Sequence, residues 1–188
     1  MCGIAAFSLD QGATVSSHWV SAARSLLGKR GPDDSGVYED LENGFGLIHT
    51  RLAILDVTSM GHQPMFSDDR RVALVFNGEI YNFPEIRIEL ESEGYFFHGN
   101  SDTEVLLNLY LSCKRHCDKS RDSLSSFLRR LNGVFAFALW DADRQSLLLA
   151  RDALGVKPLY YQHSVNGLYF SSEIKALPSI PLTLDRNA

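Results

Sequence analysis

The sequence predicts an α+β fold, because segments typical of paired hairpin strands outnumber segments typical of strand–helix–strand units. Two Asn-Gly pairs, Asn43-Gly44 and Asn166-Gly167, lie between strand-like stretches and are typical of tight turns. Helical segments with their own start and stop signals separate the runs of strands. No internal repeat or linker interrupts the 188 residues, so we expect one domain over residues 1–188.

In the first part of the chain, residues 3–8 are apolar and few, which predicts a buried strand. A helix capped by Ser16 or Ser17 is expected to run to Leu27. Residues 28–36, GKRGPDDSG, are dense in turn formers and predict a loop. Further strands are expected around residues 37–38, 46–55 and 72–76.

In the second part, Pro84 begins a helix that is expected to end at Gly94. Ser101 and Glu104 form a capping-box pattern ahead of an apolar helical stretch. Residues 112–126 are polar and rich in serine, and we interpret them as a surface loop. The remaining strands are expected at residues 134–140, 146–150, 159–162 and 168–171.

Composition restricts the class of protein. Hydrophobic residues make up 45% and charged residues 22% of the chain, as in globular proteins. The net charge of −5 argues against a nucleic-acid partner. No apolar run has the roughly 18 residues that a membrane span needs, and the N-terminus lacks the features of a secretory signal. We therefore expect a cytoplasmic protein without a membrane partner.

The chain has three cysteines, Cys2, Cys113 and Cys117. A cytosolic setting disfavours disulfides. The spacing of Cys113, His116 and Cys117 is loose for a zinc site, and no second cluster of ligands follows. No metal site is therefore predicted, and these residues are interpreted as part of a polar helix end.

Cys2 is a candidate nucleophile. A small residue at position 2 permits removal of Met1, which places a free α-amine on the same residue as the thiol. An α-amine has a pKa of about 7.7–8.0, so it can act as the base for the adjacent thiol without a separate histidine. The alternative is a small buried residue that begins a strand.

Asn77-Gly78 has two interpretations. Asn-Gly between strands commonly marks a hairpin turn. The functional interpretation is an oxyanion hole, in which the Asn77 side chain and the Gly78 backbone N–H donate to a tetrahedral intermediate.

Two charged residues could bind the α-carboxylate and the α-ammonium of an amino acid. Arg51 lies in an apolar stretch and could bind an α-carboxylate, or form a structural ion pair. Asp102 follows Ser101 at a predicted helix start, where the dipole alone favours a carboxylate, but it could also bind an α-ammonium.

In combination, these residues belong to a series of motifs that resembles one family. The motifs, in chain order, are MCGIAAF, KRGPDDSG, HTRLAILD, HQPM, FNGEIYNFPEIR, SDTEVLL, LNGVFAFALWD, ARDALGVKPLYY and FSSEIKAL. They are similar to the glutaminase domain of asparagine synthetases, which are class II glutamine amidotransferases. The resemblance runs from Met1 to about Leu177.

The resemblance implies a four-layer αββα sandwich of the N-terminal-nucleophile hydrolase type. It implies Cys2 as nucleophile and Asn77 and Gly78 as oxyanion donors. Arg51, Glu79 and Asp102 would hold the α-carboxylate and α-amine of glutamine. The main chain from Arg51 through Leu52, Ala53, Ile54 and Leu55 would line the pocket as part of a strand. Arg151, Asp152 and Lys157 also match the family and are interpreted as structural.

The implied activity is hydrolysis of glutamine to glutamate and ammonia, with no cofactor or metal for this domain. The family's ATP-binding S-G-G-x-D-S-type loop does not occur in residues 1–188. We therefore expect ATP, magnesium and the amidation of an acceptor to belong to a synthetase domain or partner subunit. The alternative function is a catalytically silent domain that senses glutamine.

Overall fold

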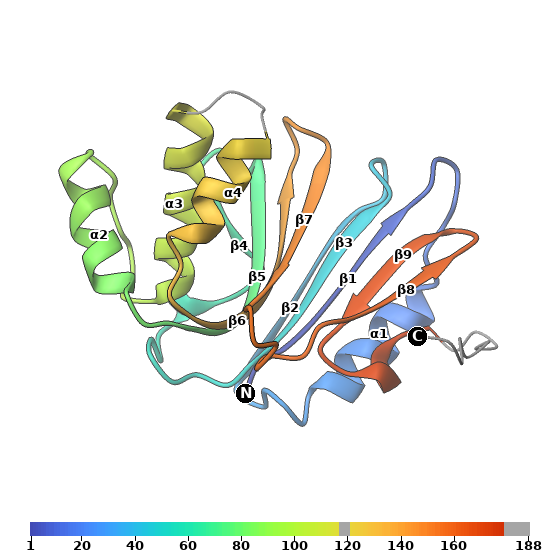
Figure 1. Cartoon of the computed structure of the whole chain (residues 1–188). Helices are drawn as coiled ribbons and strands as arrows, with labels where there is room; N and C mark the ends of the chain where they lie inside the picture. The colour runs from blue at the N-terminus through green and yellow to red at the C-terminus, as the bar shows by residue number, and fades with distance from the viewer. Residues whose placement is uncertain (117–120, 179–188) are drawn as a thin grey trace.

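The computed structural model describes residues 1–116 and 121–178 (Figure 1). The strands are β1 (Gly3–Leu9), β2 (Asp34–Asp40), β3 (Phe45–Arg51), β4 (Met65–Phe66), β5 (Val72–Ile80), β6 (Gly133–Asp141), β7 (Ser146–Arg151), β8 (Tyr160–Ser164) and β9 (Gly167–Ser171). The helices are α1 (Ser17–Leu27), α2 (Phe83–Ser92), α3 (Asp102–His116) and α4 (Arg121–Arg129), with short 3-10 helices η1 (Ser59–Gly61) and η2 (Ile174–Ala176).

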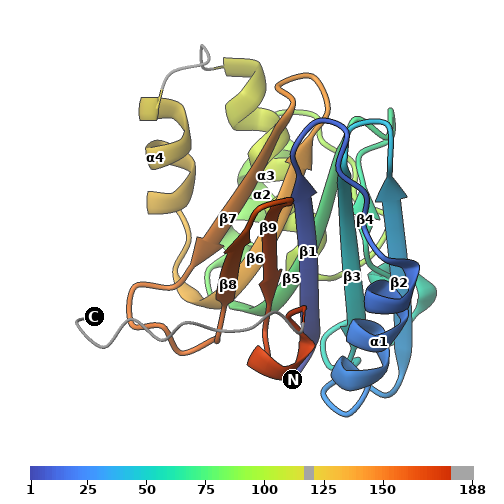
Figure 2. The same ribbon diagram turned by 90° about the vertical axis from the view of Figure 1, so that its right-hand side faces the viewer.

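Within the described residues the strands form two antiparallel sheets. One has the order β2-β3-β1-β9-β8 and the other has the order β4-β5-β6-β7. The sheets face each other, with α1 and η2 outside the first sheet and α2, α3 and α4 outside the second (Figures 1 and 2). This arrangement confirms the expected α+β fold and its four αββα layers.

Successive side chains on a strand point to opposite faces of the sheet, so one set packs between the two sheets and the other packs against the helices. On β1, Ile4 and Ala6 pack between the sheets, whereas Ala5 and Phe7 pack against α1. The second sheet contributes small side chains to the middle layer, including Ala136 and Ala138. These small residues leave room for the aromatic side chains of the same layer, Phe45, Trp140 and Phe170. Of these, Phe45 and Trp140 stack with ring centroids 4.4 Å apart.

Helix α1 forms where the sequence predicts it. Ser16 occupies the N-cap position, but its side chain makes no capping hydrogen bond. Its buried residues Trp19, Val20, Ala23 and Leu27 follow the three-to-four spacing of a single helical face. The Trp19 indole N–H donates to the Ala176 carbonyl over 3.0 Å, so η2 is fixed to the same helix.

Residues 112–126 are not the surface loop that the sequence predicted. Helix α3 continues to His116 and α4 begins at Arg121; residues 117–120 lie outside the described part. Phe127, near the end of α4, is fully buried and packs edge-on against Tyr110 and Phe137, with centroids 5.6 and 6.2 Å away. Leu124, Phe127 and Leu128 give this polar segment the apolar face that fixes a helix to the core.

The loop predicted for residues 28–36 is also shorter than expected. Strand β2 begins at Asp34, which pairs with Arg51 at the end of β3. Pairing with β3 outweighs the low strand propensity of Asp34, Ser35 and Gly36. The two Asn-Gly turns are confirmed, since Gly44 and Gly167 have φ values of 65° and 130°.

Candidate active site

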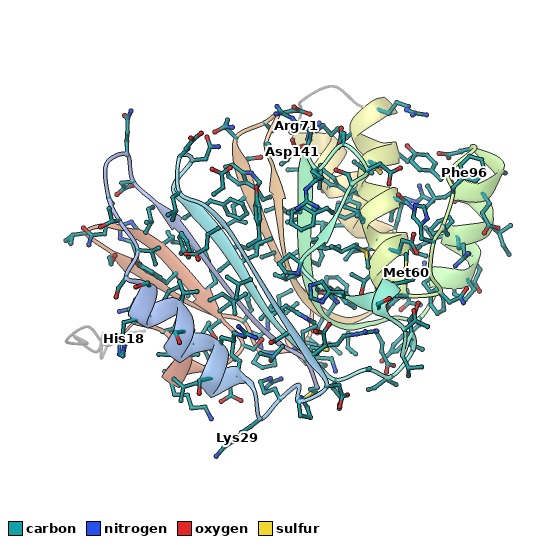
Figure 3. All side chains as sticks on the ribbon, turned by 180° about the vertical axis from the view of Figure 1, so that it is seen from behind. His18, Lys29, Met60, Arg71, Phe96 and Asp141 are labelled. Carbon is teal, nitrogen blue, oxygen red and sulfur yellow. The ribbon has the colours of Figure 1, made fainter. Side chains whose placement is uncertain are left out.

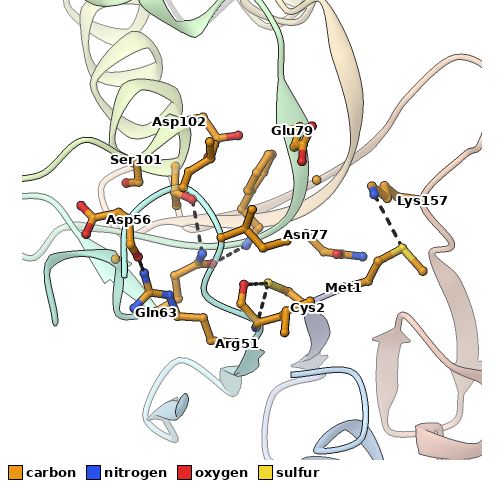
Figure 4. Close-up of a pocket in the computed structure, with 17 residues that line it drawn as sticks. Met1, Cys2, Arg51, Asp56, Gln63, Asn77, Glu79, Ser101, Asp102 and Lys157 are labelled. Atoms are coloured by element: carbon orange, nitrogen blue, oxygen red, sulfur yellow. Dashed lines mark hydrogen bonds between the residues drawn. The ribbon is translucent and has the colours of Figure 1, made fainter. Parts of the chain in front are cut away.

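A pocket of about 90 Å³ opens where β1 begins, β3 ends and α3 begins (Figure 4). It is lined by Met1, Cys2, Arg51, Leu52, Ile54, Leu55, Asp56, Gly61, Gln63, Phe76, Asn77, Gly78, Glu79, Ser101, Asp102, Thr103 and Lys157. Every residue predicted for the site lies in this lining except Ala53. The Ala53 N–H instead donates to the Asp33 carboxylate over 2.8 Å, which holds the loop beside the pocket.

Cys2 directly precedes β1, the central strand of its sheet. Its carbonyl accepts a hydrogen bond from Arg30 Nε over 2.9 Å, and Arg30 is paired with Glu173 at 3.1 Å. The next residue must be small, because a Cβ on Gly3 would lie 2.6 Å from Thr50 Oγ1. These contacts fix the main chain of Cys2.

The Cys2 thiol lies against the main chain of Leu52. The Leu52 N–H lies 3.5 Å from Sγ, and Sγ lies 3.7 Å from the Leu52 carbonyl. Burial raises the pKa of the Cys2 thiol, while the Leu52 backbone, the chain N-terminus and Arg51 act in the opposite direction. The thiol therefore needs a base to become a nucleophile.

Asn77 and Gly78 do not form a turn. They lie within β5, where Asn77 pairs with Ala136 and Gly78 with Phe135 of β6. Asn77 is 1% exposed, and its side-chain Nδ2 has no hydrogen-bond partner among the described residues. An unsatisfied buried donor costs about 1–3 kcal/mol, so a donor left open beside a pocket indicates a site for an acceptor.

Arg51 is the last residue of β3 and is only 7% exposed. Its guanidinium donates to the carbonyl of Thr58 over 2.8 Å and to that of Asp56. The strand predicted through Leu55 is therefore wrong: β3 ends at Arg51, and the following residues fold back over its guanidinium. The Asp56 carboxylate supports this loop by accepting hydrogen bonds from Thr58 and Asn100.

Asp102 begins α3 and is 4% exposed. Its carboxylate accepts a hydrogen bond from the Ile80 N–H over 3.0 Å. Burial, assisted by the nearby charge of Glu79, raises the pKa of Asp102 to about 6. A cation bound next to Asp102 would relieve this unfavourable charge.

The predicted capping box at the start of α3 is only half present. Ser101 Oγ accepts from the Glu104 N–H over 3.2 Å. The Glu104 carboxylate, however, accepts from the N–H groups of His98 and Gly99 at 2.7 and 2.8 Å. Glu104 thus fixes the preceding loop instead of completing the box.

The structure adds residues that the sequence did not assign to the site. Gln63 Oε1 accepts from the Phe76 N–H over 2.7 Å, and its Nε2 donates to Thr103 Oγ1 over 3.3 Å (Figure 4). Gln63 thus links β5 to α3 behind the pocket. Its signal in the sequence was the HQPM motif, and its burial is seen only in the structure. Lys157, interpreted from sequence as structural, lines the pocket, whereas Arg151 and Asp152 make structural contacts to its loop.

No histidine is present in the pocket lining. His49 lies in the core, 0% exposed, with Nε2 3.3 Å from the Phe76 carbonyl, and burial lowers its pKa to about 3. His62 is on the surface and contacts Asp34 at 2.7 Å. In the described part of the chain, the pocket thus offers the thiol no imidazole base.

Residues 1–116 and 121–178 contain no group of three or more His, Cys, Asp or Glu side chains that could bind a metal. Cys117, one of the three residues considered for zinc, lies outside those ranges. The same part of the chain contains no helix of the length and apolar character that crossing a bilayer requires.

The chain matches the glutamine amidotransferase domain family over residues 1–188. Asparagine synthetase 3 (glutamine-hydrolysing) of Bacillus subtilis is 42% identical over 166 residues, covering 85% of this chain and 25% of that protein. Asparagine synthetase B of Escherichia coli is 40% identical over 160 residues, covering 85% and 26%. Amidase chyE of Penicillium rubens is 38% identical over 187 residues, covering 94% and 26%.

The solved glutamine phosphoribosylpyrophosphate amidotransferase of B. subtilis has a TM-score of 0.74 to this chain at 22% identity, covering 93% of this chain and 42% of that one. It therefore shares the N-terminal-nucleophile hydrolase fold.

Fold and family match together define an enzyme of the class II amidotransferase type. The chain belongs to the glutamine amidotransferase domain family. It is homologous to the glutaminase half of glutamine-hydrolysing asparagine synthetases, and it spans about a quarter of the length of these curated relatives, 25% in the first case.

Proposed function

We propose that this chain hydrolyses the side-chain amide of glutamine through a Cys2 thioester. The observation that carries the proposal is the convergence in one pocket of the Cys2 thiol, the open Asn77 donor and the Asp102 carboxylate, without an accompanying histidine. A pocket without imidazole makes the α-amine of Cys2 the base that the thiol needs.

In the first half of the reaction, the Cys2 α-amine takes the thiol proton and Sγ attacks the amide carbon of glutamine. The oxygen of the tetrahedral intermediate accepts hydrogen bonds from Asn77 Nδ2 and the Gly78 N–H. The α-ammonium then gives its proton to the leaving nitrogen, the C–N bond breaks, and ammonia and a thioester result.

In the second half, water attacks the thioester while the α-amine accepts a proton from it. The C–S bond breaks, glutamate forms and the thiol recovers its proton. Oxidation states do not change and every proton is returned, so this cycle uses no cofactor.

Two ends of the substrate need charged partners. Arg51 binds the α-carboxylate with the N–H groups that its loop contacts leave open, and Asp102 binds the α-ammonium, with Glu79 nearby at the pocket edge. Leu52, Ile54 and Leu55 form an apolar wall of the same pocket. The main chain of Ala53 supports this wall through Asp33.

The ammonia is proposed to serve an ATP-dependent amidation in an asparagine-synthetase-type domain, in the same full-length protein or in a partner subunit. ATP and magnesium would act there. The high identity to asparagine synthetases supports this coupling.

The test combines a Cys2→Ala variant with an electrophilic glutamine analogue. We expect Cys2→Ala to lose ammonia release from glutamine while its circular dichroism and unfolding midpoint stay those of the wild type. The analogue should label Cys2 and spare Cys113 and Cys117, as read by peptide mass spectrometry. Intact mass should show that active protein begins at Cys2. Full activity in protein that retains Met1 would contradict the mechanism. Glutamine binding without ammonia release in protein that begins at Cys2 would instead indicate a glutamine-sensing role.

A further inference from the structure

Lys157 is held at the pocket by a rigid loop between β7 and β8. The Asp152 carboxylate accepts hydrogen bonds from the N–H groups of Val156, Lys157 and Phe135, at 2.9, 3.0 and 3.3 Å. Arg151 donates to the carbonyls of Lys157 and Gly155 at 2.8 and 2.5 Å. This many contacts to one short loop fix the backbone from which the lysine side chain extends.

The ammonium of Lys157 points toward the start of the chain. Its Nζ lies 3.6 Å from the Met1 sulfur, and the two side chains face each other at one side of the pocket (Figure 4). Within the described residues this is the hydrogen bond that the structure gives to the ammonium, and no carboxylate lies within ion-pair distance of it. A thioether is a weak acceptor, and it leaves with Met1 when the N-terminus is processed.

We propose that Lys157 is a positioning residue that acts through the N-terminal residue: after Met1 is removed, its ammonium faces the new N-terminus and keeps the α-amine of Cys2 unprotonated at neutral pH. The proposal rests on the proposed function, in which this amine is the base.

The physical reason is repulsion between like charges. A free α-amine with an ordinary pKa of about 7.7–8.0 is mostly protonated at neutral pH and cannot accept a proton. An ammonium nearby disfavours the protonated form and lowers that pKa. The same charge favours the thiolate over the thiol, so both changes prepare Cys2 for attack.

Other charged groups around Cys2 are already engaged. Arg30 is paired with Glu173 at 3.1 Å, and Arg51 donates to the carbonyls of its own loop. The acids that line the pocket are Asp56, Glu79 on β5 and Asp102 on α3. Asp56 and Asp102 accept hydrogen bonds from backbone N–H groups. Neither of the two pocket cations, Arg51 and Lys157, is paired with an acid in the described residues. The Arg51 guanidinium is held by the Thr58 and Asp56 carbonyls, whereas the Lys157 ammonium contacts the Met1 sulfur.

The experiment compares Lys157→Met, which removes the charge, with Lys157→Arg, which keeps it. Lys29→Met is the matched control, because Lys29 is exposed and extends away from the molecule outside the pocket (Figure 3). Intact mass first verifies that each variant has lost Met1. The readout is kcat/KM for ammonia release from glutamine between pH 5.5 and 9.5.

For Lys157→Met we expect the acid limb of the profile to move up by about one pH unit, because the variant lacks the like charge that disfavours the protonated amine. Activity should fall about tenfold at pH 6.5 and by less than about twofold at pH 9. Lys157→Arg and Lys29→Met should keep the acid limb of the wild type. If the acid limb of the kcat/KM profile stays in place in Lys157→Met, the proposal is overturned. An equal loss at every pH also overturns it, and would instead assign Lys157 to binding the glutamine carboxylate.

A second readout does not need turnover. The rate at which iodoacetamide alkylates Cys2, measured by peptide mass spectrometry across the same pH range, follows the fraction of the thiol that is ionised, which a nearby positive charge increases. Its midpoint should rise in Lys157→Met and stay unchanged in Lys29→Met; an unchanged midpoint in both overturns the inference. If the wild type released no ammonia, the proposed function would fail, whereas this alkylation profile would still decide the role of Lys157.

Discussion

The raised pKa of Asp102 makes glutamine binding dependent on pH in a way that can be calculated. The carboxyl group has a pKa of about 6 in the free protein, because it is buried beside Glu79. Below that pH it is protonated and neutral, and above it the carboxylate is charged. An α-ammonium needs the charged form, so binding should be tight above pH 6 and should weaken as the pH falls through this value.

Only protein with an ionised Asp102 binds glutamine tightly. The apparent Kd is therefore the Kd of the fully ionised protein multiplied by a factor, which is one plus the ratio of protonated to ionised Asp102. With a pKa of about 6, this factor is about 1.1 at pH 7 and about 11 at pH 5. We therefore expect glutamine binding to weaken about tenfold between pH 7 and pH 5.

The assay is isothermal titration of glutamine into Cys2→Ala protein, in which turnover and the Cys2 thiol no longer contribute. The matched control adds Asp102→Asn, which removes the charge and retains a carbonyl oxygen for the Ile80 N–H. That variant should bind weakly at pH 7 and show no change between pH 7 and pH 5. A constant Kd over this range in protein that retains Asp102 would refute the assignment of Asp102 to the α-ammonium.

The remaining predictions concern other parts of the same pocket. Asn77→Ala should lower kcat about 10²–10³-fold by removing one oxyanion donor, and a change confined to KM would mean that Asn77 only binds substrate. Arg51→Ala should raise KM for glutamine about 10- to 150-fold, which corresponds to the roughly 1.5–3 kcal/mol of a charge-assisted hydrogen bond. Arg51→Lys should recover only part of this loss. A glutamine derivative whose α-carboxylate is replaced by an uncharged amide should bind the wild type poorly. Asp102→Asn should raise the free energy of unfolding at pH 7 by about 2–3 kcal/mol, measured in urea. The reason is that the raised pKa of Asp102 makes the wild-type fold lose stability as the pH rises from about 4 to 6, and the variant has no such loss. Equal unfolding midpoints of variant and wild type at pH 7 would contradict this. The chain alone should form no asparagine from aspartate, ATP, magnesium and ammonium, and measurable asparagine would reveal a missed nucleotide site.

Much of the fold could be predicted because its signals are local. The apolar run at the start of β5 and the Asn-Gly turns depend on residues close in sequence, and both were predicted correctly. The end of β3 could not be, because it depends on the guanidinium of Arg51 drawing in the Asp56 and Thr58 carbonyls. The helix that contains Phe127 was missed because polar composition concealed an apolar face that only the core reveals.

The same distinction applies to the site. Cys2, Asn77 and Asp102 each had a structural explanation as well, and the catalytic interpretation depended on the motifs in which they occur together. The structure brings these residues into one pocket. The position of Lys157 depends on a loop fixed by Asp152 and Arg151, whose contacts span β6, β7 and the turn after them. Neither spacing nor composition predicts that such a loop directs a lysine toward the N-terminus.

The central position of β1 in its sheet determines when, during synthesis, the strand can pair with both of its neighbours. Strand β1 pairs with β3 on one side and with β9, Gly167–Ser171, on the other, so its sheet closes only after about 170 residues have been made. At 5–20 residues per second this takes roughly 10–35 s. Until then β1 lacks one of its two partner strands, and we expect the N-terminus to be accessible to the aminopeptidase that removes Met1. We therefore expect the fraction of chains that lose Met1 during synthesis to rise when elongation is slowed, and pulse-labelling with slowed or accelerated elongation would test this.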